Sequence, residues 1–93
     1  MLYVITYDIG VDQRRTRLAK LLEGYGQRVQ YSVFECDLTP AQFTGLWGKV
    51  QRRVKPAEGD SVRVYRLCAG CVQAVKLLGA GPPLETSVDV VVV

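Results

Sequence analysis

The chain of 93 residues is the size of one small domain, which we expect to span residues 1–93. Its 48% hydrophobic content is more than one small core hides easily, so we expect a self-associating oligomer. The net charge of +3 permits a nucleic-acid partner without requiring one, and the absence of histidine excludes Ser-His, Cys-His and histidine general-base catalysis.

The first predicted element is an apolar strand over residues 2–9, with Asp8 close to its end. Alternation divides its side chains between two faces, one with Tyr3, Ile5, Tyr7 and Ile9 and the other with Leu2, Val4, Thr6 and Asp8. Both faces are largely apolar, so each of them needs cover.

Two amphipathic helices are predicted from their start and stop signals. The first is expected to begin with Asp12 as its N-cap and to end at Gly24 and Gly26. The second begins at Thr39, which forms a Thr-x-x-Gln capping box with Gln42 ahead of an apolar stripe. Each helix therefore has one face to bury.

Three further strands are predicted from valine-rich and aromatic sequence, over residues 29–36, 61–67 and 72–78. Glycines and prolines mark a loop over residues 79–83. We expect the order βαββαβ, or close to it, with both helices on one face of the sheet, as in α+β ferredoxin-like folds. The opposite face is then bare unless a second copy of the chain covers it.

The C-terminal residues 86–93 end in four consecutive valines and predict one additional strand. An unpaired apolar edge of this kind promotes aggregation, so the strand needs a fixed partner. It either completes its own sheet or pairs with the neighbouring subunit, and we favour the second arrangement. No apolar run approaches the ~20 residues that cross a bilayer, so we expect no membrane insertion.

Asp8 and the arginines that follow it are the strongest chemical signal. A carboxylate at the mouth of a strand, with Arg14, Arg15 and Arg17 close behind, suits a divalent metal and a phosphate. The arginines fall in the first turns of a helix, where positive charge opposes the macrodipole unless a phosphate binds there. The alternatives are a solvated face for the arginines and a cap of the turn at Gly10 for Asp8.

A second basic group at the end of the second predicted helix has a simpler explanation. Positive charge complements the dipole at that end, so helix stability alone explains Lys49, Arg52, Arg53 and Lys55. The same group is a candidate to grip duplex phosphates if the protein is a scaffold.

Asp8 alone is a poor site for Mg²⁺, which takes one or two protein carboxylates together with waters and substrate oxygens. Asp12 is better placed as a cap, so no second acid lies nearby in the sequence. A two-fold dimer through the bare face would supply one by bringing two copies of Asp8 together. Metal-activated water is then the available nucleophile, with Mg²⁺ as the expected metal and Mn²⁺ as the alternative.

The three cysteines and a start directly at a strand, without a signal sequence, predict a cytoplasmic protein. The spacing of Cys68 and Cys71 is compatible with half a zinc site or a redox pair. Because only Cys36 is left over and histidine is absent, we favour buried apolar thiols near a turn.

Several motifs in combination resemble one known family. The run Val4-Ile5-Thr6-Tyr7-Asp8-Ile9, followed by Arg14-Arg15-x-Arg17 and Gln30-x-Ser32-Val33-Phe34-Glu35, resembles the CRISPR-associated protein two family along essentially the whole chain. The resemblance implies a ferredoxin-like homodimer with crossing C-terminal strands and metal-dependent endonuclease activity on RNA or DNA. It also implies a scaffold role, holding DNA beside the integrase called CRISPR-associated protein one.

Residue roles follow from the same resemblance by position. Asp8 is implied as the catalytic metal ligand, and Arg15 and Arg17 as catalytic residues that contact phosphate. Further contacts with the nucleic acid are implied for Arg28 and Phe34, and the helix argument adds Arg14.

Three functions follow from these patterns. The leading one is a dimeric, metal-dependent endonuclease of CRISPR spacer acquisition, in which Arg15 and Arg17 neutralise the charge that develops at phosphorus. The second is a non-catalytic DNA-binding scaffold of the integration complex. The third is a ribonuclease toxin of a related ferredoxin-like type.

Overall fold

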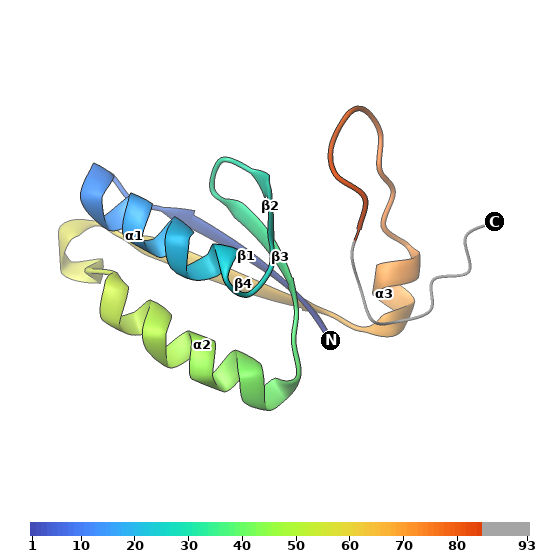
Figure 1. Ribbon diagram of the computed structural model, residues 1–93, viewed down its shortest axis with the longest axis horizontal. Helices are drawn as coiled ribbons and strands as arrows, with labels where there is room; N and C mark the ends of the chain where they lie inside the picture. Colours follow the sequence, from blue (N-terminus) through green and yellow to red (C-terminus); the bar gives the residue numbers. More distant parts are fainter. Residues whose placement is uncertain (85–93) are drawn as a thin grey trace.

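The computed structural model describes residues 1–84, which form a sheet layer and a helix layer (Figure 1). The elements in chain order are β1 (Leu2–Asp8), α1 (Asp12–Glu23), β2 (Gln27–Gln30), β3 (Val33–Asp37), α2 (Pro40–Arg53), η1 (Pro56–Glu58), β4 (Ser61–Leu67) and α3 (Ala69–Gln73). Apart from the short helices η1 and α3, this is the predicted βαββαβ order of an α+β ferredoxin-like fold. In the described part of the chain, no helix has the length and apolar character needed to span a membrane.

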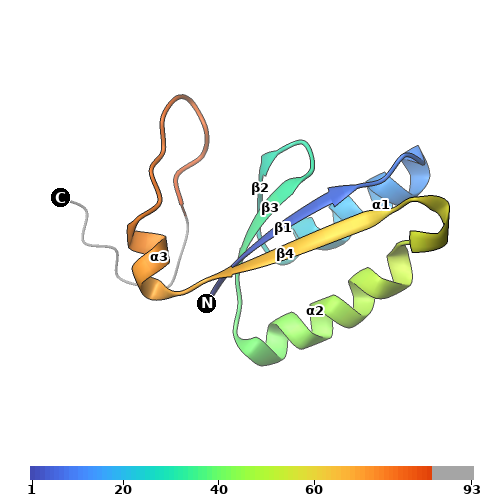
Figure 2. The same cartoon turned by 180° about the vertical axis from the view of Figure 1, so that it is seen from behind.

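The four strands form one antiparallel sheet in the order β2-β3-β1-β4. In the centre of the sheet, Ile5 of β1 lies opposite Phe34 of β3 on one side and Val64 of β4 on the other. Helices α1 and α2 lie on the same face of the sheet, as the two opposite views show (Figures 1 and 2). No comparable helix covers the other face among the described residues, which agrees with the predicted bare face.

Alternation along β1 decides which of its side chains are buried. The helix-facing set packs with α1 and α2 in one core that includes Tyr3, Ile5, Tyr7, Ile9, Leu18, Leu22, Leu46 and Val50. Tyr3 also stacks on Phe43 of α2, with 4.2 Å between the ring centroids. On the opposite face, burial decreases along the strand from Leu2, which is 1% exposed, to the exposed Asp8. Burial of one face therefore fixes the orientation of Asp8 toward the other.

The predicted strand over residues 29–36 is wrong in extent, because a turn at Tyr31 and Ser32 divides it into β2 and β3. These two short strands pair with each other as a hairpin, with a register shift between Arg28 and Gln30. Tyr31 is 94% exposed at the turn. Its β-forming side chain hid the turn from the sequence pattern, since no glycine or proline marks this position.

The predicted strand over residues 72–78 is also wrong. The backbone N–H of Val72 donates to the carbonyl of Cys68 at 2.9 Å, so the chain enters α3 directly after β4. One buried contact explains this outcome, because Val72 is only 2% exposed and tertiary packing overrides its β propensity. The additional strand expected over residues 86–93 lies outside the described residues and stays a prediction.

The two helix starts had different outcomes. The predicted capping box of α2 is confirmed: the hydroxyl of Thr39 accepts from the Gln42 N–H at 3.1 Å, and Gln42 Oε1 accepts from the Thr39 N–H at 2.8 Å. The predicted N-cap at Asp12 is wrong, since Val11 occupies the N-cap of α1 without a side-chain hydrogen bond. Asp12 instead pairs with Arg15 one turn later.

Candidate functional site

Asp8 ends β1 on the sheet face that α1 and α2 leave uncovered. Its side chain is exposed, and its neighbour across the sheet is Ser61 of β4. Two residues earlier, Thr6 lies between Val33 of β3 and Arg63 of β4. Asp8 therefore offers a carboxylate to solvent close to the hydroxyl groups of Thr6 and Ser61 and the guanidinium of Arg63.

Arg63 is the basic residue that shares this face with Asp8, and the sequence analysis missed it. Alternate residues of a strand are roughly 7 Å apart, so Arg63 beside Thr6 has the length to reach a phosphate held at Asp8. A hydrogen bond with the Tyr65 side chain raises the pKa of Arg63. The alternation of residues 61–67 carried the signal, but reading it required the register of β4 against β1.

Arg14 is held by an internal ion pair. Its Nε donates to Asp60 Oδ2 at 2.8 Å, its Nη2 donates to Asp60 Oδ1 at 3.1 Å, and its Nη1 lies 3.5 Å from Glu58 Oε1. The hydrogen bonds raise the pKa of Arg14 and lower the pKa of Asp60. The backbone N–H of Lys55, which donates to Asp60 at 2.8 Å, lowers the pKa of Asp60 further.

Arg15 has internal partners as well. Its Nη1 donates to the carbonyl of Ile9 at 3.0 Å, and its Nη2 donates to the carboxylate of Asp12. The expectation that the charges of Arg14 and Arg15 oppose the helix dipole unless a phosphate binds is therefore corrected, because the fold supplies acceptors that offset both charges. In the part of the chain that the structure describes, no ion pair joins Asp8 to an arginine. The expected cluster of arginines facing Asp8 is not formed inside one subunit.

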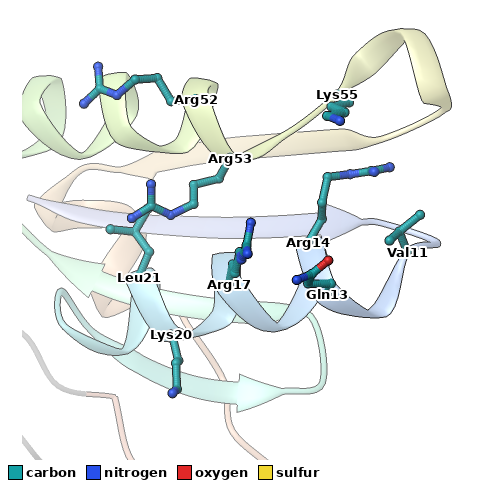
Figure 3. A pocket seen from close by; sticks show the side chains of 9 residues that line it. All are labelled: Val11, Gln13, Arg14, Arg17, Lys20, Leu21, Arg52, Arg53 and Lys55. Carbon is teal, nitrogen blue, oxygen red and sulfur yellow. The ribbon is translucent and has the colours of Figure 1, made fainter.

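Arg17 lines a basic groove between α1 and α2 (Figure 3). The groove has a volume of about 610 Å³ and is lined by Val11, Gln13, Arg14, Arg17, Lys20, Leu21, Arg52, Arg53 and Lys55. Figure 3 shows Arg17 of α1 and Arg53 of α2 extending into the space between the two helices. Every charged residue of this lining is basic.

Most of the charge in the basic groove is not neutralised internally. Within the described residues, Arg14 and Lys55 pair with Glu58, whereas no ion pair is formed by Arg17, Lys20, Arg52 or Arg53. Arg52 and Arg53 end α2 as predicted and complement its dipole. Helix stability alone did not predict their position in the fold, where Arg52 and Arg53 lie across a groove from Arg17. Facing cations repel one another, so a polyanion in the groove is favoured.

Phe34 and Arg28 contact each other at the β2–β3 hairpin. Phe34 is fully buried, and the guanidinium carbon of Arg28 lies 5.3 Å from its ring centroid. The ring has no free surface for a nucleic acid, which corrects the implied direct contact. Arg28 itself is exposed and lines a hollow of about 320 Å³ together with Arg15 and Tyr31. Two of the implied phosphate contacts therefore share one hollow.

The described residues of one chain do not form a complete metal site. The described residues contain no group of three or more His, Cys, Asp or Glu side chains that would hold a metal ion. Asp8 supplies one exposed carboxylate, which fits Mg²⁺ only when waters, substrate oxygens or a second subunit supply the remaining ligands. The donor set is thus compatible with a metal shared between subunits.

The three cysteines differ in their surroundings. Cys36 is buried, and burial raises the pKa of its thiol to about 11. Cys68 and Cys71 are both exposed, so their predicted burial as apolar thiols is wrong. The reason is their position at the end of β4, where the chain leaves the sheet and enters α3.

Comparisons with known proteins agree with this fold. Residues 1–75 match the family described as CRISPR associated protein Cas2. The chain is 55% identical over 93 residues to CRISPR-associated endoribonuclease Cas2 1 of Chloroflexus aurantiacus, with all of both chains covered. It is 51% identical over 83 residues to CRISPR-associated endoribonuclease Cas2 3 of Synechocystis sp., covering 89% of this chain and 88% of the relative.

Two solved structures extend the comparison to three dimensions. The crystal structure of Streptococcus pyogenes Cas2 at pH 6.5 is 37% identical, with a TM-score of 0.73, and the match covers 85% of this chain and 100% of that one. A chain of a partial Cas6-RT-Cas1–Cas2 complex is 32% identical, with a TM-score of 0.71 and coverage of 83% and 89%. The match over most of the chain and the identity along its full length show that the chain belongs to the CRISPR-associated Cas2 family.

Proposed function

We propose that the protein is a homodimeric, metal-dependent endonuclease of CRISPR adaptation, which hydrolyses a phosphodiester bond in RNA or DNA. The observation that carries this proposal is the exposed carboxylate of Asp8 at the end of β1, on the uncovered face of the sheet. Relatives named endoribonucleases support the activity, and the similar chain of a complex named for Cas1 and Cas2 supports the integrase as partner. The nucleic-acid substrate and this partner lead us to expect a cytoplasmic location.

The proposed dimer joins the uncovered faces of two sheets. On this face Val4 is only partly covered and Tyr65 is 50% exposed, so apolar surface remains for a second copy. A two-fold axis through the face brings the same residues of both subunits together, including both copies of Asp8. One acid per chain thus becomes a pair of acids, which is the donor set that Mg²⁺ or Mn²⁺ takes with waters and substrate oxygens.

The side chains of this face have distinct tasks in the proposed reaction. The two Asp8 carboxylates would hold the metal, which would supply Lewis-acid chemistry and a water of lowered pKa. Arg63 binds a non-bridging oxygen of the phosphate, where a charge-assisted hydrogen bond stabilises the developing negative charge. Arg15, which the family implies as catalytic, binds the flanking backbone from the first turn of α1. Arg17, also implied as catalytic, lines the basic groove on the other side of the sheet and therefore belongs with the scaffold function.

A second function, the DNA-binding scaffold, is favoured by a different observation. The basic groove lies between α1 and α2, on the opposite side of the sheet from Asp8, and gathers cations from both helices (Figure 3). Phosphate contacts of this kind fix position and affinity without reading the base sequence. The scaffold and the nuclease use different faces, so one dimer has room for both functions.

The decisive experiment compares Asp8→Asn with the wild type for Mg²⁺-dependent cleavage and for duplex binding. We expect the variant to lose cleavage and to keep binding, because the substitution removes one charge without touching the basic groove. Asp12→Asn is the control, since this exposed acid lies near the same strand end but belongs to α1. Full cleavage by the Asp8→Asn variant contradicts the catalytic assignment, and loss of duplex binding contradicts the separation of the Asp8 face from the basic groove.

A further inference from the structure

Cys68 and Cys71 form a close pair of thiols that none of the proposed functions uses. Their Sγ atoms lie 3.3 Å apart in hydrogen-bond contact, and both side chains are exposed. Cys68 follows the last residue of β4, and Cys71 lies one turn later in α3. The two sulfur atoms are therefore neighbours in space and open to small reagents from solvent.

We propose that Cys68 and Cys71 form a reversible thiol–disulfide site that a low-molecular-weight disulfide oxidises. The Cys68 thiolate attacks one sulfur of the small disulfide, whose S–S bond breaks and releases one small thiol that takes up the Cys68 proton. The Cys71 thiolate then attacks the Cys68 sulfur of the mixed disulfide. The Cys68–Cys71 bond forms, and the second small thiol leaves with the Cys71 proton. Two protein thiols are oxidised, and one small disulfide is reduced to two thiols.

The geometry favours an internal bond over two separate modifications. A disulfide joins its sulfur atoms at about 2.0 Å, so the pair needs to approach by roughly 1.3 Å, which side-chain rotation supplies. A Cβ added at the intervening Gly70 would meet no atom of a neighbouring segment within 4 Å, so the first turn of α3 between the cysteines is not crowded. Val72, which is 2% exposed, anchors α3 and keeps Cys71 next to the end of β4.

The pKa values of the two thiols are shifted in opposite directions, which assigns their order in the reaction. The pKa of Cys68 is lowered, first by the backbone N–H of Cys71 and then by the Cys71 thiol, which both stabilise the Cys68 thiolate. The pKa of Cys71 is raised, first by its hydrogen bond with the Cys68 side chain and then by the negative charge of Cys68. Cys68 is therefore the attacking residue and Cys71 the resolving residue.

The position of the pair gives oxidation a structural consequence. The disulfide would fix the turn between β4 and α3, and after α3 the chain continues without regular structure to residue 84. The side-chain amide of Gln27 in β2 donates to the carbonyl of Pro83 at 2.8 Å, so this segment returns to the sheet. We therefore expect the oxidation state to change the rigidity of the connection between β4 and α3.

The test exposes the full-length reduced protein to glutathione disulfide and follows the products by intact mass and peptide mapping. We expect the wild type to form one internal disulfide that dithiothreitol reverses. Cys71→Ser should stop at the mixed disulfide on Cys68, because the resolving thiol is missing. Cys68→Ser should react slowly, because the remaining thiol has the raised pKa. Stable mixed disulfides on both cysteines of the wild type would overturn the proposal.

The rate of alkylation by iodoacetamide at neutral pH gives an independent measurement of the reactivity of each thiol. We expect Cys68 to react about tenfold faster than Cys71, in line with its larger thiolate fraction. Cys36 is the internal control, because burial and its raised pKa make it inert in the folded protein. Both serine variants replace exposed groups, and unchanged thermal unfolding verifies that they fold. Equal alkylation rates at Cys68 and Cys71 would refute the assigned order of attack.

Discussion

The Arg14 guanidinium and the Asp60 carboxylate form a two-point ion pair that joins the first turn of α1 to the start of β4. The Nε–Oδ2 distance is 2.8 Å and the Nη2–Oδ1 distance is 3.1 Å, and the residue Asp60 is only 6% exposed. Asp60 also accepts a hydrogen bond from the backbone N–H of Lys55, which lies in the connection that follows α2. One buried acid thus ties three elements together, and the positive charge of Arg14 at a helix start is explained by the fold.

Replacing Asp60 with Asn is expected to destabilise the fold in a pH-dependent manner. The pKa of Asp60 in the folded protein lies below its ordinary value of 3.8, so the ionised side chain stabilises the fold above that pH. The contribution is lost as the pH falls through the native pKa, since the acid is then protonated in both states. Thermal unfolding should show a midpoint lowered by several degrees at neutral pH and a difference that disappears well below pH 3.8.

Glu58→Gln is the matched control for this measurement. The Glu58 carboxylate lies 3.5 Å from Arg14, but it is 54% exposed. Because solvent screens this ion pair, its loss should have little effect on stability. Equal losses for the two variants, or a difference for Asp60→Asn that persists in acid, would contradict the structural role of the Arg14 and Asp60 pair.

The layers of the fold were predictable from sequence because apolar periodicity and the Thr39 capping box act locally. The turn at Tyr31 and the helix that contains Val72 were not, because tertiary contacts decide both against local propensity. The candidate site shows the same division between features that depend on local sequence and features that depend on tertiary contacts. Asp8 was visible as a strand-end acid, whereas Asp60 and Arg63 gain their roles from partners that lie far away in the sequence.

Gly26 allows β3 to approach the end of α1, so its replacement should be costly. An added Cβ would lie 2.2 Å from the carbonyl oxygen of Glu35 and 2.6 Å from the Sγ of Cys36. Chemical denaturation of Gly26→Ala is expected to show a loss of about 1–3 kcal/mol in the free energy of unfolding. Gly45→Ala in the middle of α2 is the control, because its Cβ meets no atom within 4 Å and should stabilise the helix by up to about 1 kcal/mol. A neutral result at Gly26 would show that the backbones are farther apart than described.

The basic groove should determine the salt dependence of DNA binding. Each phosphate contact that is lost reduces the slope of log K against log salt by about 0.9, so the double variant Arg52→Gln with Arg53→Gln should reduce it by roughly two. Replacing Arg66 and Lys76 with Gln removes the same charge outside the groove and should change the slope much less. Titrations at several salt concentrations measure both slopes. An unchanged slope in the groove variant would leave Arg52 and Arg53 with helix stability as their only role.

Arg63 should contribute to cleavage from the uncovered face. Its replacement with Gln removes the guanidinium that shares this face with Asp8, and kcat/KM should fall on the order of tenfold to a hundredfold. Arg66→Gln is a strict control, because Arg66 lies on the same strand opposite Tyr3 and thus on the helix-covered face. Single-turnover cleavage at saturating protein separates the chemical step from binding. Equal losses for the two variants would indicate a general effect of charge.

A site shared by two copies of Asp8 makes a quantitative prediction for mixed dimers. Equal amounts of wild type and Asp8→Asn, unfolded together and refolded, give about one quarter wild-type dimers by random pairing. If each metal needs both carboxylates, cleavage per dimer falls to about one quarter of the wild-type value; if each subunit acts alone, about one half remains. Titration of Mn²⁺ into the wild type should in parallel give one ion per dimer. An activity near one half, or one ion per subunit, would contradict the shared centre while leaving the single-subunit role of Asp8 intact.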